Sequence, residues 1–445
     1  MMTQMNHTAP LEIYQLNHAS LLIVMGQVRL LTDPWYEGTA FDEGWKLRWD
    51  NPEAIALAAT ATHLWVSHPH SDHLHLPTLQ KICQINPNII VLANRSYNYD
   101  MCGQFQALGF GSVQPFGENQ TIYLTEHCTL QRISSGIIDS MLVIRWNNVT
   151  ILNLNDCVLQ KRALRTIARR IGKIDLLLCN FNHAGKLLHF PEKTPEEVQE
   201  TLKAHYRHQT RLLAPNYVLP YASHHQYASP FSIRQNLSML EPDDLVEAAP
   251  DIHTIPLYPG QCVKIDFSAP SNRPIVIGQA QDRAAEAGTS RVSAGLPDRI
   301  PSSKEFQDAA EIFAKRMDHS FGPLRRLLPS ITVRIREDQR IMRMRSGRFQ
   351  ETADNGSADI EACAEKFLHW LSLPYGTDSF VVGGHFGILR PCIGRIKLLF
   401  AILLLAEGKI SPRYLIKPSL WLFLFRRYHE LLAALLSLRV SSSYQ

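Results

Sequence analysis

Short hydrophobic runs recur along the first 267 residues, and turns or helical segments separate them. Short apolar runs that are rich in β-branched residues and bounded by turn-forming residues are typical of buried strands. Strands that alternate with helical segments pack as layers of sheet and helix. The pattern therefore predicts a layered α/β domain, on the evidence of the runs SLLIVM, VRLLTDP, HLWVS, NIIVLA, SMLVIRW, VTILNLND and IDLLLCN.

The pattern changes near residue 268. Residues 268–303 are rich in Ala, Ser, Gly and Pro, which predicts a linker or a surface excursion. Further on, ITVRIRED and QRIMRMRSGRF predict a β-hairpin, and one helix is expected to place Ile360, Ala364, Phe367, Leu368 and Leu371 on a single face. We thus expect a catalytic domain over 1–267, a linker over 268–303 and a smaller α+β domain of unknown role over 304–445.

Composition restricts the classes of partner. The chain has 445 residues, of which 45% are hydrophobic and 19% charged, as in ordinary globular proteins. Lys and Arg number 45 against 41 Asp and Glu, and this net charge of +4 is too small to indicate a nucleic-acid partner. The expected partner is a small-molecule substrate.

Nothing in the sequence predicts export or a membrane span. The start, MMTQMNHTAPLEIY, lacks the basic and apolar segments of a secretory signal, so a cytoplasmic protein is expected. The most apolar late runs, 398–406 and 420–425, are shorter than the ~20 residues that a spanning helix needs, and they are interpreted as core helices. Eight scattered cysteines without a CxxC pair predict free thiols.

One stretch concentrates metal-ligating side chains. WVSHPHSDHLHL, residues 65–76, follows a predicted strand over 61–66. Alternation along an extended chain would turn His68 and His70 to the same side, and Asp72 and His73 follow where the chain turns toward a helix. Imidazoles and carboxylates are ligands for divalent metals, so HxHxDH predicts a site for one or two ions. We favour this over a solvated histidine-rich loop because further candidate ligands follow other strands.

The stretch His68-Pro-His70-Ser-Asp72-His73 resembles the signature of the metallo-β-lactamase-fold hydrolases. That family has a four-layer αββα sandwich with its metals at the edge of the two sheets. LNHASLLIVMGQVRLLTDPW is similar to the L-ascorbate-6-phosphate lactonase branch, whereas TDPWYEGTAFDEGWKL, SHPHSDHLHLPTL and ILNLNDC resemble the metallo-β-lactamase-like part of CMP-N-acetylneuraminate hydroxylases. The resemblance covers roughly residues 10–265, and PYGTDSFVVGGHF is weakly similar to the region C-terminal to this part in the same relatives.

The resemblance implies a set of metal ligands. The strand-end Asp156 takes the place of a metal-bridging carboxylate, although an Asn-Asp turn is the alternative. A late strand should deliver the last histidine, which is either His224 or His225. His183 stays open as ligand, substrate contact or structural histidine. The implied and candidate ligands are His68, His70, Asp72, His73, Asp156, His183, His224 and His225.

Two further residues are candidate supports, and one expected ligand is missing. Asp33 and His18 would orient the ligating imidazoles, with a turn residue and a buried structural histidine as the respective alternatives. Many relatives supply another histidine between HxHxDH and the bridging aspartate, but here LQRISSGIIDSMLVI contains none. That position could be filled by His183, by a histidine of the 224–225 pair, or stay open, so the number of metals is open.

The chemistry expected first is hydrolysis. A divalent ion held by imidazoles and carboxylates lowers the pKa of bound water toward neutrality. Asp72 would then act as the catalytic residue that orients or deprotonates this water. We expect zinc, with iron or manganese as alternatives, and a small, anionic ester, lactone, amide or phosphodiester as substrate.

Two other functions compete with hydrolysis. An iron-dependent oxidase or hydroxylase would fit the sialic-acid-hydroxylase resemblance. However, no Cys here has a His two or three residues after it, so a Rieske cluster has no ligand pairs and electrons would come from an electron-transfer partner or from the substrate. The third function is a non-catalytic descendant that keeps the fold for binding.

Overall fold

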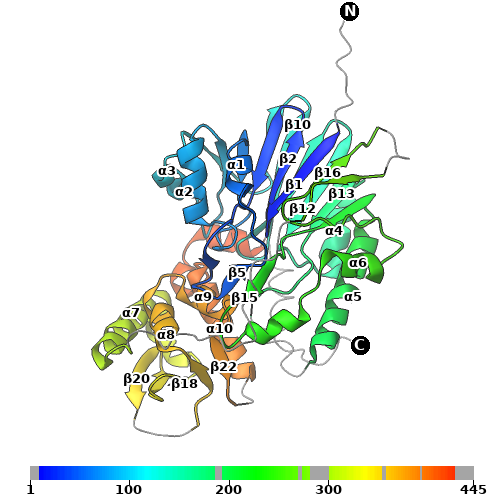
Figure 1. The fold of residues 1–445 in the computed structure, drawn as a ribbon. Coiled ribbons are helices and arrows are strands. Elements are labelled where there is room, and N and C mark those ends of the chain that lie inside the picture. Colours follow the sequence, from blue (N-terminus) through cyan, green and yellow to red (C-terminus); the bar gives the residue numbers. More distant parts are fainter. Residues whose placement is uncertain are drawn as a thin grey trace, which may run out of the picture.

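The computed structural model describes residues 10–185, 193–268, 273–280, 300–352, 357–390 and 393–425. Figure 1 shows a two-sheet domain, with strands in its centre and helices on both sides, and a second domain of strands and helices below it. The predicted linker is only partly within these ranges, because 269–272 and 281–299 lie outside the described residues.

The first sheet has eight strands in the order β17-β16-β1-β2-β3-β6-β7-β8. Strands β3, β6 and β7 run parallel, so their carboxyl ends meet at one edge of the sheet. The strands are β1 (Leu11–Asn17), β2 (Ser20–Met25), β3 (Val28–Thr32), β6 (His63–Trp65), β7 (Ile90–Asn94), β8 (Ser112–Phe116), β16 (Cys262–Ile265) and β17 (Ile275–Ile277).

The second sheet has six strands in the order β14-β13-β12-β11-β10-β9. Its inner face packs on that of the first sheet through a core that includes Leu21, Leu130, Leu142 and Leu178. The strands are β9 (Thr121–Thr125), β10 (Cys128–Ser135), β11 (Asp139–Trp146), β12 (Val149–Asn155), β13 (Leu176–Cys179) and β14 (Tyr217–Pro220).

Helices cover both outer faces. The first sheet carries α1 (Ala54–Ala58), α2 (Leu76–Ile85) and α3 (Cys102–Leu108), and the second carries α4 (Lys161–Ile171), α5 (Pro195–Leu213) and α6 (Pro242–Ala248). The order helix, sheet, sheet, helix confirms the predicted αββα sandwich of the metallo-β-lactamase fold. A small sheet of β4 (Thr39–Ala40), β5 (Trp45–Leu47) and β15 (His225–Tyr227), followed by the 3-10 helix η1 (Ile233–Ser238), lies between the sandwich and the second domain.

The second domain is a five-stranded sheet packed on helices, in the order β20-β19-β18-β21-β22. Aromatic rings around Trp370 and Phe313 fill its core. Its elements are α7 (Ser303–Phe321), η2 (Gly322–Leu327), β18 (Ile331–Ile335), β19 (Ile341–Arg345), β20 (Arg348–Thr352), β21 (Ile360–Ala362), α8 (Ala364–Ser372), α9 (Gly376–Val382), β22 (Phe386–Ile388), α10 (Ile393–Glu407) and η3 (Pro412–Tyr414).

One helix begins later in the structure than the sequence predicted. Ile360 was expected on the same helical face as Phe367, but it lies in β21, which pairs in parallel with β18. The backbone of Cys363 is extended, and α8 begins only at Ala364. Ile360, Ala362 and Ala364 are all buried, and this period-two alternation is that of a strand, which the helical interpretation overlooked.

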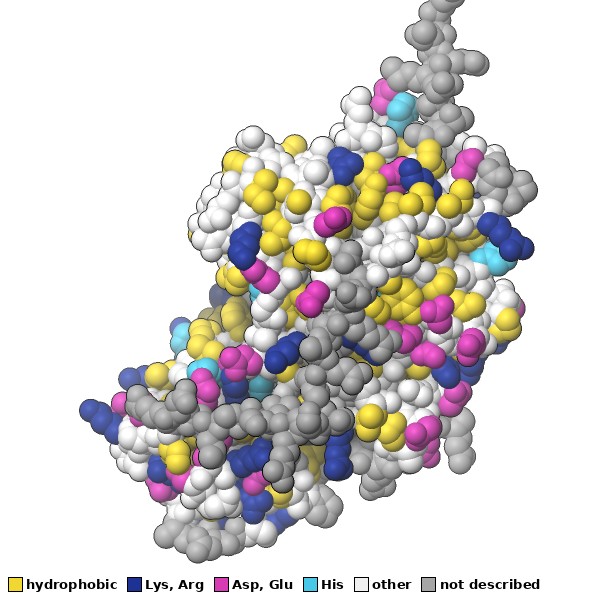
Figure 2. All heavy atoms as spheres, in the orientation of Figure 1, with side chains coloured by type: hydrophobic (Ala, Val, Ile, Leu, Met, Phe, Trp, Pro, Cys, Tyr) yellow, Lys and Arg dark blue, Asp and Glu magenta, His cyan; other side chains and the backbone are white. Residues whose placement is uncertain are grey.

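No described helix is long and apolar enough to cross a membrane. The apolar run 398–406 lies in α10, where Leu399 and Leu403 are buried in the core of the second domain. Basic and acidic side chains are interspersed on the face shown in Figure 2, over both domains.

The two domains touch backbone to backbone. A Cβ added to Gly44, beside β5, would lie 2.4 Å from the Cα of Gly383, which follows α9. The indole Nε1 of Trp45 donates to the carbonyl oxygen of Val382 at 3.2 Å. Because these contacts leave no room for a side chain, the end of α9 is held directly against β5.

A titratable ion pair adds to this contact. His369 Nδ1 of α8 lies 2.8 Å from Asp42 Oδ2, and Lys366 Nζ lies 3.1 Å from Asp42 Oδ1. The hydrogen bond with Asp42 raises the pKa of His369 against the effect of its burial. Burial works to raise the pKa of Asp42, but His369 and Lys366 lower it overall.

The pair predicts a pH window for interdomain stability. The contribution of His369 is complete below its unfolded pKa of about 6.5 and is lost as pH rises through its folded value. That of Asp42 is present above about pH 4 and is lost as pH falls through its lowered pKa. Urea unfolding should show His369→Gln destabilised by up to about 1 kcal/mol at about pH 5.5 and by less at about pH 8.5. An equal loss at both pH values would contradict the ion pair.

Candidate metal centre

The loops at one end of the two sheets carry the candidate ligands. His18 lies in the turn between β1 and β2, and Asp33 follows β3. The HxHxDH segment follows β6, and Asp156 follows β12. Strand ends of both sheets therefore bring together side chains that are far apart in the sequence.

His73 lies at the centre of the cluster and is fully buried. Its Nε2 lies 3.1 Å from Asp156 Oδ2 and 3.3 Å from Asp72 Oδ2, and Asp72 Oδ2 is also 3.1 Å from His18 Nε2. Two groups of three donors result, His18 with Asp72 and His73, and His68 with His73 and Asp156, and in each group the ligand atoms lie within 4.8 Å of one another. His73 belongs to both.

Asp139 stands beside the first two histidines of the motif, and it was not among the predicted ligands. His68 Nε2 lies 2.8 Å from His70 Nδ1 and 3.9 Å from Asp139 Oδ1. Asp139 begins β11, next to the β10–β11 turn where relatives of this fold were expected to supply a histidine. The signal was an acidic residue at the start of a buried strand, in a stretch where only a histidine was expected.

His68 and His73 each have a partner on the ring nitrogen that faces away from the other ligands. His68 Nδ1 lies 2.9 Å from Ser67 Oγ, and His73 Nδ1 lies 3.5 Å from Asp33 Oδ2. Asp33 is itself fixed, because it accepts a hydrogen bond from the backbone N–H of Ser67 at 2.7 Å. Such outer contacts orient metal-binding histidines, and Asp33 lies where a supporting residue was predicted.

His70 takes its outer partner from the second domain. Its Nε2 lies 3.3 Å from Asp378 Oδ1, at the start of α9. No metal-site role was predicted for Asp378, and the only signal was the weak resemblance of PYGTDSFVVGGHF to the same relatives. The second domain thus reaches the ligand cluster.

His183 does not join the cluster. Its Nδ1 lies 2.8 Å from the hydroxyl of Tyr227 and its Nε2 lies 2.9 Å from Ser238 Oγ, so both ring nitrogens are occupied. Of the three roles left open for it, these two contacts agree with a structural histidine. Asp139, not His183, lies beside His68, with its Oδ1 at 3.9 Å from His68 Nε2.

His224 and His225 point to different surroundings. The ring of His225 stacks on Trp45 at 3.8 Å and lies 5.2 Å from the ring of His18. The ring of His224 instead lies against Phe181, and burial lowers its pKa to about 3. Of the two, His225 lies beside the donor group of His18, Asp72 and His73.

The carboxylates of the cluster favour the protonated, positively charged form of two of its histidines. Burial opposes protonation of His70, but Asp378 and Asp72 raise its pKa to about 9. Burial also opposes protonation of His73. Asp72 and Asp156 nevertheless hold the pKa of His73 well above its usual range. Protons and metal ions compete for the same imidazole nitrogens, and a divalent cation would replace these protons.

Unsatisfied polar atoms show that the residues fit a metal. Within the described part of the chain, Asp72 Oδ1, Asp156 Oδ1, His18 Nδ1 and both ring nitrogens of His225 are buried without a hydrogen-bond partner. Burying such atoms unpaired costs about 1–3 kcal/mol each, and coordination to a cation would remove that cost. The cluster therefore suits a divalent metal centre.

Comparison with known families agrees with this geometry. The model described as "Beta-lactamase superfamily domain" matches residues 12–158, a range that includes the HxHxDH segment and Asp156. The match covers about a third of the chain, and over residues 12–158 the chain is similar to that superfamily domain. This match confirms the resemblance on which the predicted fold was based.

Curated relatives fall in the branch that the sequence resembles. Cytidine monophosphate-N-acetylneuraminic acid hydroxylase of Danio rerio is 30% identical over 149 residues, which cover 32% of this chain and 25% of that protein. The protein of the same name from Asterias rubens is 26% identical over 289 residues, or 60% of this chain and 43% of that protein. The alignments thus span less than half the length of these relatives.

Two solved structures are similar to part of this chain at low sequence identity. CmlA from Streptomyces venezuelae, described as a diiron beta-hydroxylase, is 17% identical with a TM-score of 0.41 and covers 58% of this chain and 54% of that chain. Igni18, a metallo hydrolase from Ignicoccus hospitalis KIN4/I, is 13% identical with a TM-score of 0.40 and covers 58% of this chain and 100% of that chain.

Proposed function

We propose that this protein is an iron-dependent oxidase or hydroxylase of a small molecule. The observation that carries the proposal is the surroundings of His68 Nε2, which lies 2.8 Å from His70 Nδ1 and 3.9 Å from Asp139 Oδ1, so that two imidazoles and a carboxylate are neighbours beside the two donor groups. Two imidazoles and one carboxylate with open positions are the ligand type of non-haem Fe(II) oxygenases. Hydrolysis was the first expectation from the sequence, because the HxHxDH segment resembles metallohydrolases and no Rieske ligand pairs are present.

The donors around His73 support the same metal class. His73, Asp72 and Asp156 supply one imidazole and two carboxylates, and His18 adds a second imidazole 3.1 Å from Asp72. Carboxylate-rich sets with imidazoles accommodate iron or manganese as well as zinc, whereas soft metals prefer thiolates. No described cysteine belongs to either three-residue donor group.

The curated relatives support hydroxylation as the reaction class. Bound iron would supply the oxygen chemistry, and the chain's own residues would hold and orient the metal. Inserting one oxygen atom of O₂ into a C–H bond reduces the other atom to water, which consumes an electron pair and two protons. This sequence has no Rieske ligand pairs, so those electrons would come from an electron-transfer partner or from the substrate.

Hydrolysis stays as the second candidate, because residues 12–158 match a superfamily domain in which metal-activated water is common chemistry. In that case Asp72, which lies between His18 and His73, would orient the attacking water. The substrate would be a small ester, lactone, amide or phosphodiester.

Metal content and oxygen uptake together test the proposal. Protein purified without chelator should contain iron at about one or two equivalents by elemental analysis. With a reduced ferredoxin as electron donor and CMP-N-acetylneuraminate as first probe, it should consume O₂ faster than the zinc-loaded protein. Stoichiometric zinc, with cleavage of bis-p-nitrophenyl phosphate and no O₂ uptake, would instead support the hydrolase. Native protein without metal would overturn both.

A further inference from the structure

We propose that Asp378 of the second domain is a positioning residue for the metal centre, which holds the His70 imidazole so that its Nδ1 faces the other ligands. The inference rests on the metal centre of the proposed function and not on the identity of the metal. It gives the second domain a role in a site whose candidate ligands come from the first domain.

The two nitrogens of His70 face different neighbours. Nδ1 lies 2.8 Å from His68 Nε2, inside the ligand cluster, and Nε2 lies 3.3 Å from Asp378 Oδ1. If Nε2–H donates to this carboxylate, the lone pair of Nδ1 is left for a metal. This is the arrangement in which a carboxylate behind a histidine fixes its tautomer and its ring orientation.

The backbone around Asp378 is anchored in its own domain. The N–H groups of Thr377 and Asp378 donate to the carboxylate of Glu407 at 2.9 and 3.1 Å. Glu407 ends α10, and its carboxylate lies 3.8 Å from Arg316 Nη1 of α7. Asp378 is therefore fixed to the helices that form the core of the second domain.

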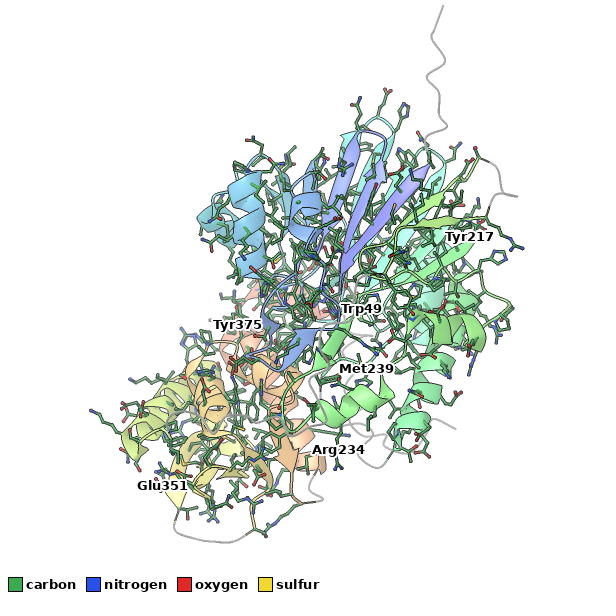
Figure 3. All side chains as sticks on the ribbon, viewed as in Figure 1. Trp49, Tyr217, Arg234, Met239, Glu351 and Tyr375 are labelled. Carbon is green, nitrogen blue, oxygen red and sulfur yellow. The ribbon has the colours of Figure 1, made fainter. Side chains whose placement is uncertain are left out.

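The contact between the domains fixes Asp378 relative to His70. His385 Nε2, beyond α9, lies 2.8 Å from the carbonyl oxygen of Phe41, and the Phe41 ring lies edge-on to His70 with centroids 5.5 Å apart. Figure 3 shows Tyr375, the residue before α9, at the junction between the second domain and β5. The same loop of the first domain thus touches both the α9 region and the imidazole that Asp378 holds.

Asp42 provides a matched control for the possibility that Asp378 only stabilises the contact between the two domains. It is also an acidic residue of the interdomain contact, with His369 and Lys366 of α8 as its partners. It belongs to neither of the two three-residue donor groups found among the described residues. If Asp378 acts only by joining the domains, Asp42→Asn should weaken metal binding as much as a change at Asp378 does.

Cobalt titration of the full chain tests the proposal. In metal-free protein, Asp378→Ala should weaken Co²⁺ binding by about 10–100-fold and alter its visible spectrum. Asp378→Asn should have a smaller effect because its amide oxygen still accepts from Nε2–H, and Asp42→Asn should bind Co²⁺ like the wild type. Chelator competition would give the affinities, and circular dichroism would confirm folding.

The outcomes separate the two inferences. Wild-type Co²⁺ affinity in both Asp378 variants, or an equal loss in Asp42→Asn, would overturn the positioning role and leave the metal centre intact. A wild-type protein that binds no Co²⁺ would overturn the metal centre and with it the proposed function.

Discussion

Replacing His73 by alanine should abolish metal binding and activity together. His73 is the one residue shared by the two donor groups, with Asp72 and Asp156 at 3.3 and 3.1 Å from its Nε2. Loss of a residue behind a ligand already costs about 10–100-fold in metal affinity, so loss of this shared ligand should exceed about 100-fold. Elemental analysis and turnover under the conditions that support the wild-type reaction would measure the effect.

His63→Ala is the matched control for this variant. His63 begins β6, just before the motif, and its Nδ1 lies 2.9 Å from the hydroxyl of Thr62, not in the cluster. This variant should keep the metal content of the wild type. A His73→Ala protein that is folded by circular dichroism and retains full metal would show that the cluster is not the metal centre.

Local patterns account for the part of the site that could be predicted. Asp33, the HxHxDH segment and Asp156 each follow a strand directly, and strand ends of one edge meet in space. A hydrophobic run followed by a polar ligand is visible in the sequence. His183 also follows a strand, and only its hydrogen bonds to Tyr227 and Ser238 distinguish it from a ligand.

Asp378 could not have been predicted in the same way. Its contact with His70 depends on how the second domain docks, through close approaches such as Gly44 to Gly383. Sequence spacing carries no information about docking between two folded units. The hydrophobic pattern predicted the existence of the second domain but not the face that it presents.

The strands also divide into those that the sequence predicts and those that it does not. Buried strands such as β12 leave an apolar run that predicts them. β17 was not predicted, because it lies within the stretch interpreted as a linker. Its side chains Ile275, Val276 and Ile277 are 62%, 41% and 46% exposed. A strand that extends the edge of a sheet with exposed side chains has no buried face to impose a pattern.

The second large effect is expected at Asp139. Asp139→Asn keeps the size of the side chain but removes the negative charge next to His68, so metal affinity should fall by at least about 10–100-fold. Turnover should fall by at least the same factor. Asp251→Asn is the control, because Asp251 pairs with Arg211 on the surface, and it should change neither quantity.

Asp139→His tests the choice of metal at the same position. The side chain projects from the start of β11, where the neighbouring Ser140 Oγ accepts from the buried guanidinium of Arg132 at 3.0 Å. A histidine held there would replace the two-histidine, one-carboxylate set with three imidazoles, the set found in catalytic zinc sites. The ratio of zinc to iron taken up from an equimolar mixture should therefore rise above that of the wild type. An unchanged ratio, with normal metal content, would place Asp139 outside the coordination of the metal and remove the main support for an iron oxygenase.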